Sequence, residues 1–141
     1  MWSCEEFGGI GAGQYFEAHQ SELPNMSLVM ESDLGVFQPL GLQFTGNNAS
    51  TRIMNKIGEL LEPINATIVT TGGEGTDISP WQNHGVPGAS LYNANDRYFW
   101  YHHSNGDTMS VLNSDEIDKC AAVWAVHAYT VANLDQLLPR D

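Results

Sequence analysis

Short apolar runs alternate with amphipathic stretches along the chain. The apolar runs lie at residues 28–30, 36–44, 66–71 and 86–92. Each has the length of a β-strand, although Pro39 and Gly41 should break the second. Because these runs are separated by segments with helical spacing, the pattern predicts an α/β sheet.

Three segments have the features of helices. Residues 11–20 form the first, and a second runs from a cap at Ser50 or Thr51 to Leu61, where Pro63 should stop it. The third and clearest begins at Asn113, where the sequence resembles a capping box. Its apolar positions follow a helical stripe through Ile117, Ala121, Trp124, Ala128, Val131 and Leu138. We expect this long helix to cover one face of the sheet.

Composition narrows the possible partners. The 141 residues suffice for one compact domain, and 42% of them are apolar. Seventeen acidic residues against five basic ones give a formal charge of −12, which disfavours nucleic acid and anionic membrane surfaces. No run approaches the roughly 18 apolar residues of a membrane span, and the N-terminus has neither the basic nor the apolar part of a signal peptide. Three glycosylation sequons, at Asn25, Asn48 and Asn65, point weakly to a secretory protein.

Acidic and histidine side chains follow several of the predicted strands. Glu5 and Glu6 precede a Gly-Gly turn, Asp33 follows the 28–30 run, and His103 lies in a segment rich in turn residues. Ligands of open α/β sheets bind at the carboxyl ends of the strands, where these side chains would converge. Carboxylates and imidazoles without cysteine are typical of catalytic rather than structural zinc. One glutamate of the pair could hold a metal while its neighbour acts as general base.

Each of these features also has an ordinary structural explanation. The glutamate pair can be a solvated acidic pair beside a loop, and Asp33 can be a helix cap or turn residue. His103 can belong to a surface turn with His102.

Four further side chains are weighed in the same way. Asp107, four residues after His103, can orient a ligand histidine from outside the metal shell. Asp77 closes a Glu-Gly-Thr-Asp loop after a strand. This loop lacks the lysine of a phosphate-binding loop, so its functional alternative is to line a substrate. His84 follows a short helical turn and His127 lies inside the last helix, and both are interpreted as structural.

Five motifs occur in an order that resembles a known family. They are Glu-Glu-x-Gly-Gly, Met-Glu-Ser-Asp, Glu-Gly-Thr-Asp, Gly-Val-Pro-Gly-Ala-Ser-Leu and Tyr-Phe-Trp-x-His-His-Ser-x-Gly-Asp-Thr, spread from residue 5 to residue 108. The chain is thereby similar to the co-catalytic di-zinc aminopeptidase-like metallopeptidases. The resemblance implies the C-terminal part of a three-layer α/β/α zinc exopeptidase domain with a mostly parallel sheet, spanning residues 1–141.

The resemblance also implies roles for individual residues. Glu5 would be the general base, Glu6 and His103 ligands of one zinc ion, and Asp33 a ligand of the second. Asp107 and Asp77 would lie outside the metal shell or in a substrate loop. The implied activity is hydrolysis of short peptides by metal-activated water, in an exopeptidase of the carboxypeptidase or dipeptidase type. The resemblance also implies a secreted or lysosomal protein, for which a homodimer is one option.

One departure from the family pattern limits this expectation. The family uses a further histidine and a bridging aspartate before the Glu-Glu motif, and only four residues precede that motif here. We therefore expect a fragment with an incomplete metal site and little activity of its own. The alternatives are a non-catalytic truncated product or a partner-binding domain, and, further off, a glycan- or peptide-binding module with Trp81 and Trp100 as its aromatic surface.

Overall fold

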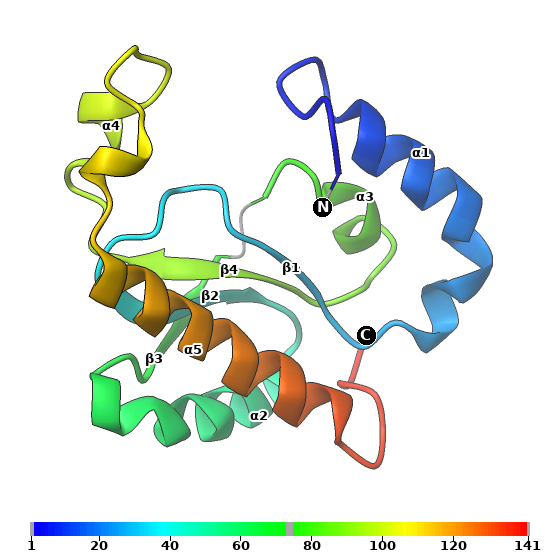
Figure 1. Ribbon diagram of the computed structural model, residues 1–141. Coiled ribbons are helices and arrows are strands. Elements are labelled where there is room, and N and C mark those ends of the chain that lie inside the picture. Colours follow the sequence, from blue (N-terminus) through cyan, green and yellow to red (C-terminus); the bar gives the residue numbers. More distant parts are fainter. Residues whose placement is uncertain (1, 73–74, 141) are drawn as a thin grey trace.

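A computed structural model describes residues 2–72 and 75–140 and shows a mixed α/β fold (Figure 1). Four strands form one sheet in the order β1-β4-β2-β3. They are β1 (Val29–Glu31), β2 (Pro39–Thr45), β3 (Ile68–Thr71) and β4 (Gly88–Asn93). β1 pairs with β4 and β2 with β3 in parallel, while β2 and β4 are antiparallel. The mostly parallel sheet expected from the sequence is thus confirmed.

Helices flank this sheet. The α-helices are α1 (Ile10–His19), α2 (Asn48–Gly58), α3 (Ser79–Gln82), α4 (Tyr98–Tyr101) and α5 (Ser114–Ala132). Short 3-10 helices span Gln20–Asn25, Glu59–Ile64 and Met109–Val111. Figure 1 shows α2 and α5 together on one side of the sheet, with α1 and α3 at the opposite end of the molecule from α4. None of the helices in the described ranges is long and apolar enough to cross a membrane.

The main core lies between the sheet and the α2–α5 pair. Leu42 faces Leu91 and Phe44 faces Ala89 across the β2–β4 ladder, and all four are buried. Residues of α2 and α5 close over them, among them Met54, Ile57, Cys120, Val123 and Val131. Burial of one such large apolar side chain contributes about 1.5–3 kcal/mol, so this face holds the sheet together.

A second apolar cluster covers the other face beside β1. Trp81 and Phe16 are buried here, joining α3 to α1. Val29 of β1 packs against this cluster, whereas its neighbour Met30 packs against the main core. Helices therefore lie on both sides of the sheet near β1, but Ile68 on the outer strand β3 is 47% exposed.

The strand at 36–44 differs from the expectation. Pro39 does not interrupt β2 but begins it, because the first strand residue need not donate to the ladder. Gly41 lies inside β2 with φ of +145°, and a Cβ there would collide with the carbonyl of Ile68. The glycine thus permits the close approach of β2 to β3, and it borders a register irregularity in the pairing of β2 with β4.

The second helix also begins earlier than predicted. Asn47, rather than Ser50 or Thr51, is its cap, since the Asn47 side chain accepts from the backbone N–H groups of Ala49 and Ser50 at 3.0 and 2.9 Å. The α-helix ends at Gly58 and continues as a 3-10 helix through Pro63 to Ile64.

For the long helix, the predicted start is confirmed, whereas the predicted stripe is correct only in part, with Val131 buried and Trp124 partly buried against the core. The Asn113 side chain accepts from the N–H groups of Asp115 and Glu116 at 2.9 and 3.2 Å. The buried positions are Cys120, Val123, His127 and Val131. The predicted stripe shares only Val131 with them within the helix, because counting apolar residues favoured Trp124 and passed over the buried histidine. Leu138 is buried but lies beyond the end of α5.

Candidate active site at the end of the sheet

A tight turn before α1 presents the Glu5-Glu6 pair. The carbonyl of Glu5 accepts from the N–H groups of both Gly8 and Gly9 at 2.8 Å. Gly8 and Gly9 have φ values of +100° and +64°, which favour glycine. The turn predicted from the glycine pair is therefore present, with Glu5 half-buried and Glu6 exposed.

A second turn, after α4, presents His103. The hydroxyl of Ser104 donates to the Tyr101 carbonyl at 2.6 Å and accepts from the Gly106 N–H at 3.1 Å. His103 has φ of +54°, a left-handed conformation that costs most side chains about 1–2 kcal/mol. Its ring stacks on that of His102 with centroids 3.8 Å apart. Strain of this kind persists where the surrounding turn enforces it, and it is often found at functional sites.

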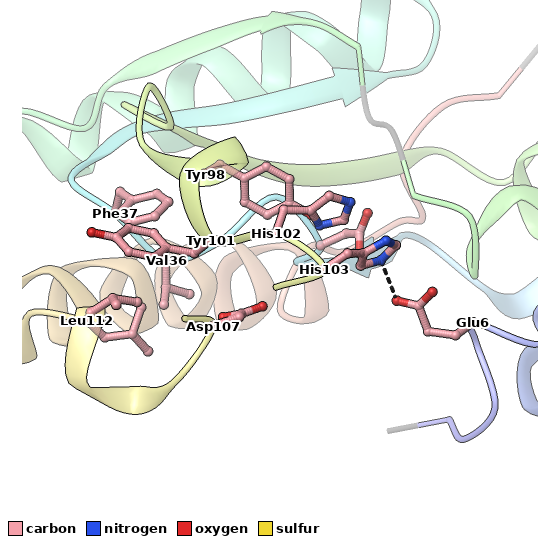
Figure 2. A pocket seen from close by; sticks show the side chains of 12 residues that line it. Glu6, Val36, Phe37, Tyr98, Tyr101, His102, His103, Asp107 and Leu112 are labelled. Atoms are coloured by element: carbon pink, nitrogen blue, oxygen red, sulfur yellow. Dashed lines mark hydrogen bonds and ion pairs between the residues drawn. The ribbon is translucent and has the colours of Figure 1, made fainter. Parts of the chain in front are cut away.

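The two turns meet although they lie far apart in sequence. His103 Nε2 is 3.0 Å from Glu6 Oε1, across 97 positions (Figure 2). Both side chains remain more than half exposed, at 62% and 69%, so water screens their interaction and the pair adds little to stability. Its interest lies in the two donor atoms that it brings together.

Glu6 and His103 line a cavity of about 320 Å³, and Asp33 and Asp107 line it with them. Figure 2 shows the apolar side chains of Val36, Phe37 and Leu112 on the opposite part of this cavity. No lysine or arginine occurs among its lining residues in the described parts of the chain. Glu6 and His103 therefore lie in an acidic part of the cavity and the apolar side chains in another part, with Asp107 between the two in Figure 2.

The carboxylates of the cavity also affect Tyr98, which lies between its two parts. Burial raises the pKa of Tyr98, and the nearby carboxylates of Asp33, Asp107, Glu6 and Glu5 raise it further. The phenol thus stays protonated as a hydrogen-bond donor at neutral pH. Negative potential from four carboxylates favours a cationic group in the cavity.

Zinc can be tested against the spacing of these donors. Two ligands at 2.0–2.1 Å from a tetrahedral ion lie about 3.3 Å apart, close to the 3.0 Å between His103 Nε2 and Glu6 Oε1. Within residues 2–72 and 75–140, however, no group of three or more His, Cys, Asp or Glu side chains is close enough to hold an ion. The described residues can thus supply two of the four ligands of one zinc ion and do not complete its coordination shell.

Other predicted site residues lie outside this cavity. Glu5 does not line it, although its carboxylate is near enough to affect Tyr98. Asp77 lies beside Glu31, and burial followed by the charge of Asp33 raises the Asp77 pKa. Glu74, named with the same loop, falls outside the described residues.

Glu31 is a polar residue that the sequence reasoning missed. It ends β1, and its carboxylate accepts two backbone hydrogen bonds from the loop that carries Asp77. Burial is the largest cause of its raised pKa. Its place could have indicated it, since Glu31 lies two residues before Asp33 at the carboxyl end of the predicted strand.

The remaining candidates have structural surroundings. His84 Nδ1 bonds to the Pro80 carbonyl at 2.8 Å, and His127 is fully buried in α5. Trp81 is buried whereas Trp100 is 69% exposed, so the two cannot form one aromatic binding surface.

The sequon asparagines Asn25, Asn48 and Asn65 are all exposed. The second sequon, however, lies in the first turn of α2, and its Ser50 is buried with the hydroxyl bonded to Asn47.

Comparison with known proteins connects this arrangement to a family. The sequence model of peptidase family M28 matches residues 1–128. The chain is 51% identical over 140 residues to carboxypeptidase Q of Xenopus laevis, covering 99% of this chain and 30% of the relative. It is 52% and 51% identical over 141 residues to the carboxypeptidases Q of Mus musculus and Homo sapiens, covering 100% of this chain and 30% of each relative. The chain therefore spans about a third of the length of these relatives.

A solved structure agrees with the sequence matches. The fold is similar to the crystal structure of a peptidase M28 precursor from Shewanella amazonensis SB2B, with a TM-score of 0.88 and 27% sequence identity, covering 100% of this chain and 32% of that one. These matches confirm the resemblance to a metallopeptidase family inferred from the five motifs, and the chain belongs to peptidase family M28.

Proposed function

We propose that the chain forms part of a zinc-dependent exopeptidase that hydrolyses short peptides. The observation that carries this proposal is the convergence of Glu6 and His103, 97 positions apart, at 3.0 Å in a cavity that Asp33 and Asp107 also line. Family membership supports a peptidase. The relatives' name, carboxypeptidase Q, supports an exopeptidase.

Each side chain then has a distinct task. Glu6 and His103 would hold one zinc ion, Asp33 would hold a second, and Asp107 would stay outside the metal shell. When bound, zinc acidifies water and polarises a peptide carbonyl. Glu5, half-buried in the same turn as Glu6, would take the proton from the attacking water and return it to the leaving amine.

The cavity suggests which part of a peptide it receives. Its acidic part suits a protonated amino group. The apolar part, with Val36, Phe37 and Leu112, suits an uncharged side chain. A short peptide such as a dipeptide carries both kinds of group and fits both parts.

We further propose that the chain has little activity by itself. The described residues bring together two donors and not a full ligand set, and the family resemblance places a histidine and a bridging aspartate elsewhere in the enzyme. A bridging ligand fixes two catalytic metals about 3.5–4 Å apart. The alternative is a non-catalytic truncated product or a partner-binding domain. In that case, the chain would remain inactive even when the rest of the enzyme is supplied.

A chimera tests this function directly. The matching segment of Mus musculus carboxypeptidase Q, 52% identical over 141 residues, is replaced by this chain and the protein is assayed with zinc and dipeptides. We expect hydrolysis by the chimera, loss of at least about 100-fold in kcat in Glu5→Gln, and no loss in the control Glu17→Gln on the exposed side of α1. A folded, zinc-loaded chimera without activity, or an isolated chain that turns over at about 1–1000 per second, would contradict the proposal.

We also propose that the protein is secreted or lysosomal and that it can form a homodimer. The exposed Asn25 and Asn65 are the better glycan acceptors, because the second sequon, at Asn48, is engaged in a helix cap. Expression in a secreting cell with glycosidase treatment would measure this as a mass shift, and the absence of any shift in secreted protein would oppose it.

A further inference from the structure

The carboxylate of Glu31 joins two parts of the chain that are 46 residues apart. Its Oε2 atom accepts from the backbone N–H groups of Asp77 and Ile78 at 3.0 and 3.1 Å. Glu31 lies opposite Ser90 in the β1–β4 pairing, so the sheet fixes its backbone. Hydrogen bonds to a charged acceptor are stronger than neutral ones. The turn at residues 76–78 is thereby attached to the end of β1.

Gly75, directly before this turn, lies against the same carboxylate. A Cβ added at Gly75 would collide with the Glu31 side chain, so only glycine allows the loop to approach. On the other side of the turn, Ile78 and Trp81 are buried in the body of the protein. The turn is therefore held both by the strand and by the core beside α3.

Asp77 extends from this turn toward the first functional turn. Its Oδ1 atom is buried and has no hydrogen-bond partner among the described residues. The same atom would lie 3.7 Å from a Cβ built on Gly9, in ordinary contact distance. Gly9 donates its N–H to the carbonyl of Glu5, so the Asp77 side chain borders the turn that presents Glu5 and Glu6.

We propose that Glu31 is a positioning residue for the catalytic turn. Through its two backbone hydrogen bonds it holds the Asp77 turn against residues 5–9, and this contact fixes where the Glu5 and Glu6 side chains lie. Its consequence for catalysis rests on the proposed function. The contacts themselves do not, because they exist without metal or substrate.

A metal-free arm tests the contacts in the isolated chain by amide hydrogen exchange followed with NMR. In Glu31→Ala we expect exchange at Asp77 and Ile78 to accelerate at least about tenfold, and exchange at Gly8 and Gly9 to accelerate with it. Glu31→Gln, which keeps an oxygen acceptor, should restore most of the protection, and Glu17→Ala should change none of these amides. If exchange accelerates at Asp77 and Ile78 alone, Glu31 has only a local role and the proposal is overturned.

A second pair of variants covers the case in which Glu31→Ala does not fold. Gly75→Ala keeps the Glu31 carboxylate and pushes the loop away from it, so it should expose the same four amides. Gly13→Ala is the matched control, since a Cβ there meets nothing within 4 Å. Unchanged exchange at Gly8 and Gly9 in a folded Gly75→Ala chain would also overturn the proposal.

The chimera supplies the catalytic arm. Glu31→Ala should lower kcat by about 10- to 100-fold, as loss of an outer orienting partner does, with little change in KM, and Glu31→Gln should recover most of it. Equal losses in both variants would mean that charge rather than positioning matters, which overturns the proposal. A chimera that is inactive without any substitution refutes the proposed function, and the metal-free arm then decides the role of Glu31 alone.

Discussion

His127 should make the folded chain less stable in mild acid. The side chain is fully buried, and its Nδ1 lies 2.9 Å from the Val123 carbonyl. A carbonyl can only accept, so Nδ1 carries the proton and Nε2 is left as a bare acceptor. Nε2 is buried without a partner in the described structure. Protonation would therefore bury a charge with no group to receive its hydrogen bond.

The sign of the pH dependence follows from the shift. Burial lowers the pKa of His127 below its ordinary value of 6.5, and the bond to Val123 only partly opposes this. Below pH 6.5 the unfolded chain binds a proton that the folded chain does not. Stability then falls by up to about 1.4 kcal/mol for each pH unit, until the folded pKa is reached. Above pH 6.5 His127 is neutral in both the folded and the unfolded chain, so it no longer makes stability depend on pH.

The assay is urea unfolding followed by tryptophan fluorescence at pH 7.5, 6.5, 5.5 and 4.5. His127→Phe removes the titrating group and His127→Gln keeps a polar side chain. Glu31 and Asp77 have raised pKa values, so they favour the folded state as pH falls, but they titrate in every variant and cancel in the difference. The stability of the original chain relative to His127→Phe should decline below pH 6.5. A difference that stays constant from pH 7.5 to 4.5 would refute the buried neutral histidine.

Three other measurements test the scaffold. Asn47→Ala should cost about 1–2 kcal/mol of unfolding free energy and Asn113→Ala about 1 kcal/mol or less, because the second cap is exposed; equal losses in urea titrations would contradict this order. Leu42→Ala, at a fully buried position between sheet and helices, should cost about 2–5 kcal/mol, and a loss below 1 kcal/mol would refute the core assignment. A thiol reagent should label exposed Cys4 quickly and buried Cys120 only on unfolding, since burial raises the Cys120 pKa to about 11; fast labelling of both would oppose the fold.

Local chemistry explains which elements could be predicted. The start of α5 was readable because Asn113 and the two N–H groups that it caps lie within three residues. The course of β2 could not be predicted, because a glycine is required at position 41 by the close carbonyl of Ile68 in another strand. The buried face of α5 was predicted only in part for a similar reason. Its sequence fits more than one stripe, and only the packing against the sheet selects the one with Cys120 and Val123.

The candidate site shows the same division between local and distant effects. The turn around Glu5 was predicted from its glycines, and the turn around His103 from its polar residues. No local pattern indicates that the two turns meet. The expectation that Glu6 lies near His103 rested on their places after predicted strands and on the resemblance to a family. Glu31 carried no family role and was missed, although its hydrogen bonds to the Asp77 turn are as short as the Glu6–His103 contact.

This arrangement separates the residues that support folding from those that support chemistry. The core side chains lie between the sheet and α2 and α5, whereas Glu5, Glu6, Asp33 and His103 lie on turns and loops outside any strand or helix. Turns hold few apolar contacts, so their geometry depends on specific hydrogen bonds and on backbone conformations such as the left-handed His103. Substitutions in the core should therefore reduce stability first and activity as a consequence. Substitutions at Glu31 should instead change the geometry of the turns while the sheet remains folded, because its two hydrogen bonds are to backbone N–H groups of the turn at residues 76–78 and not to the sheet.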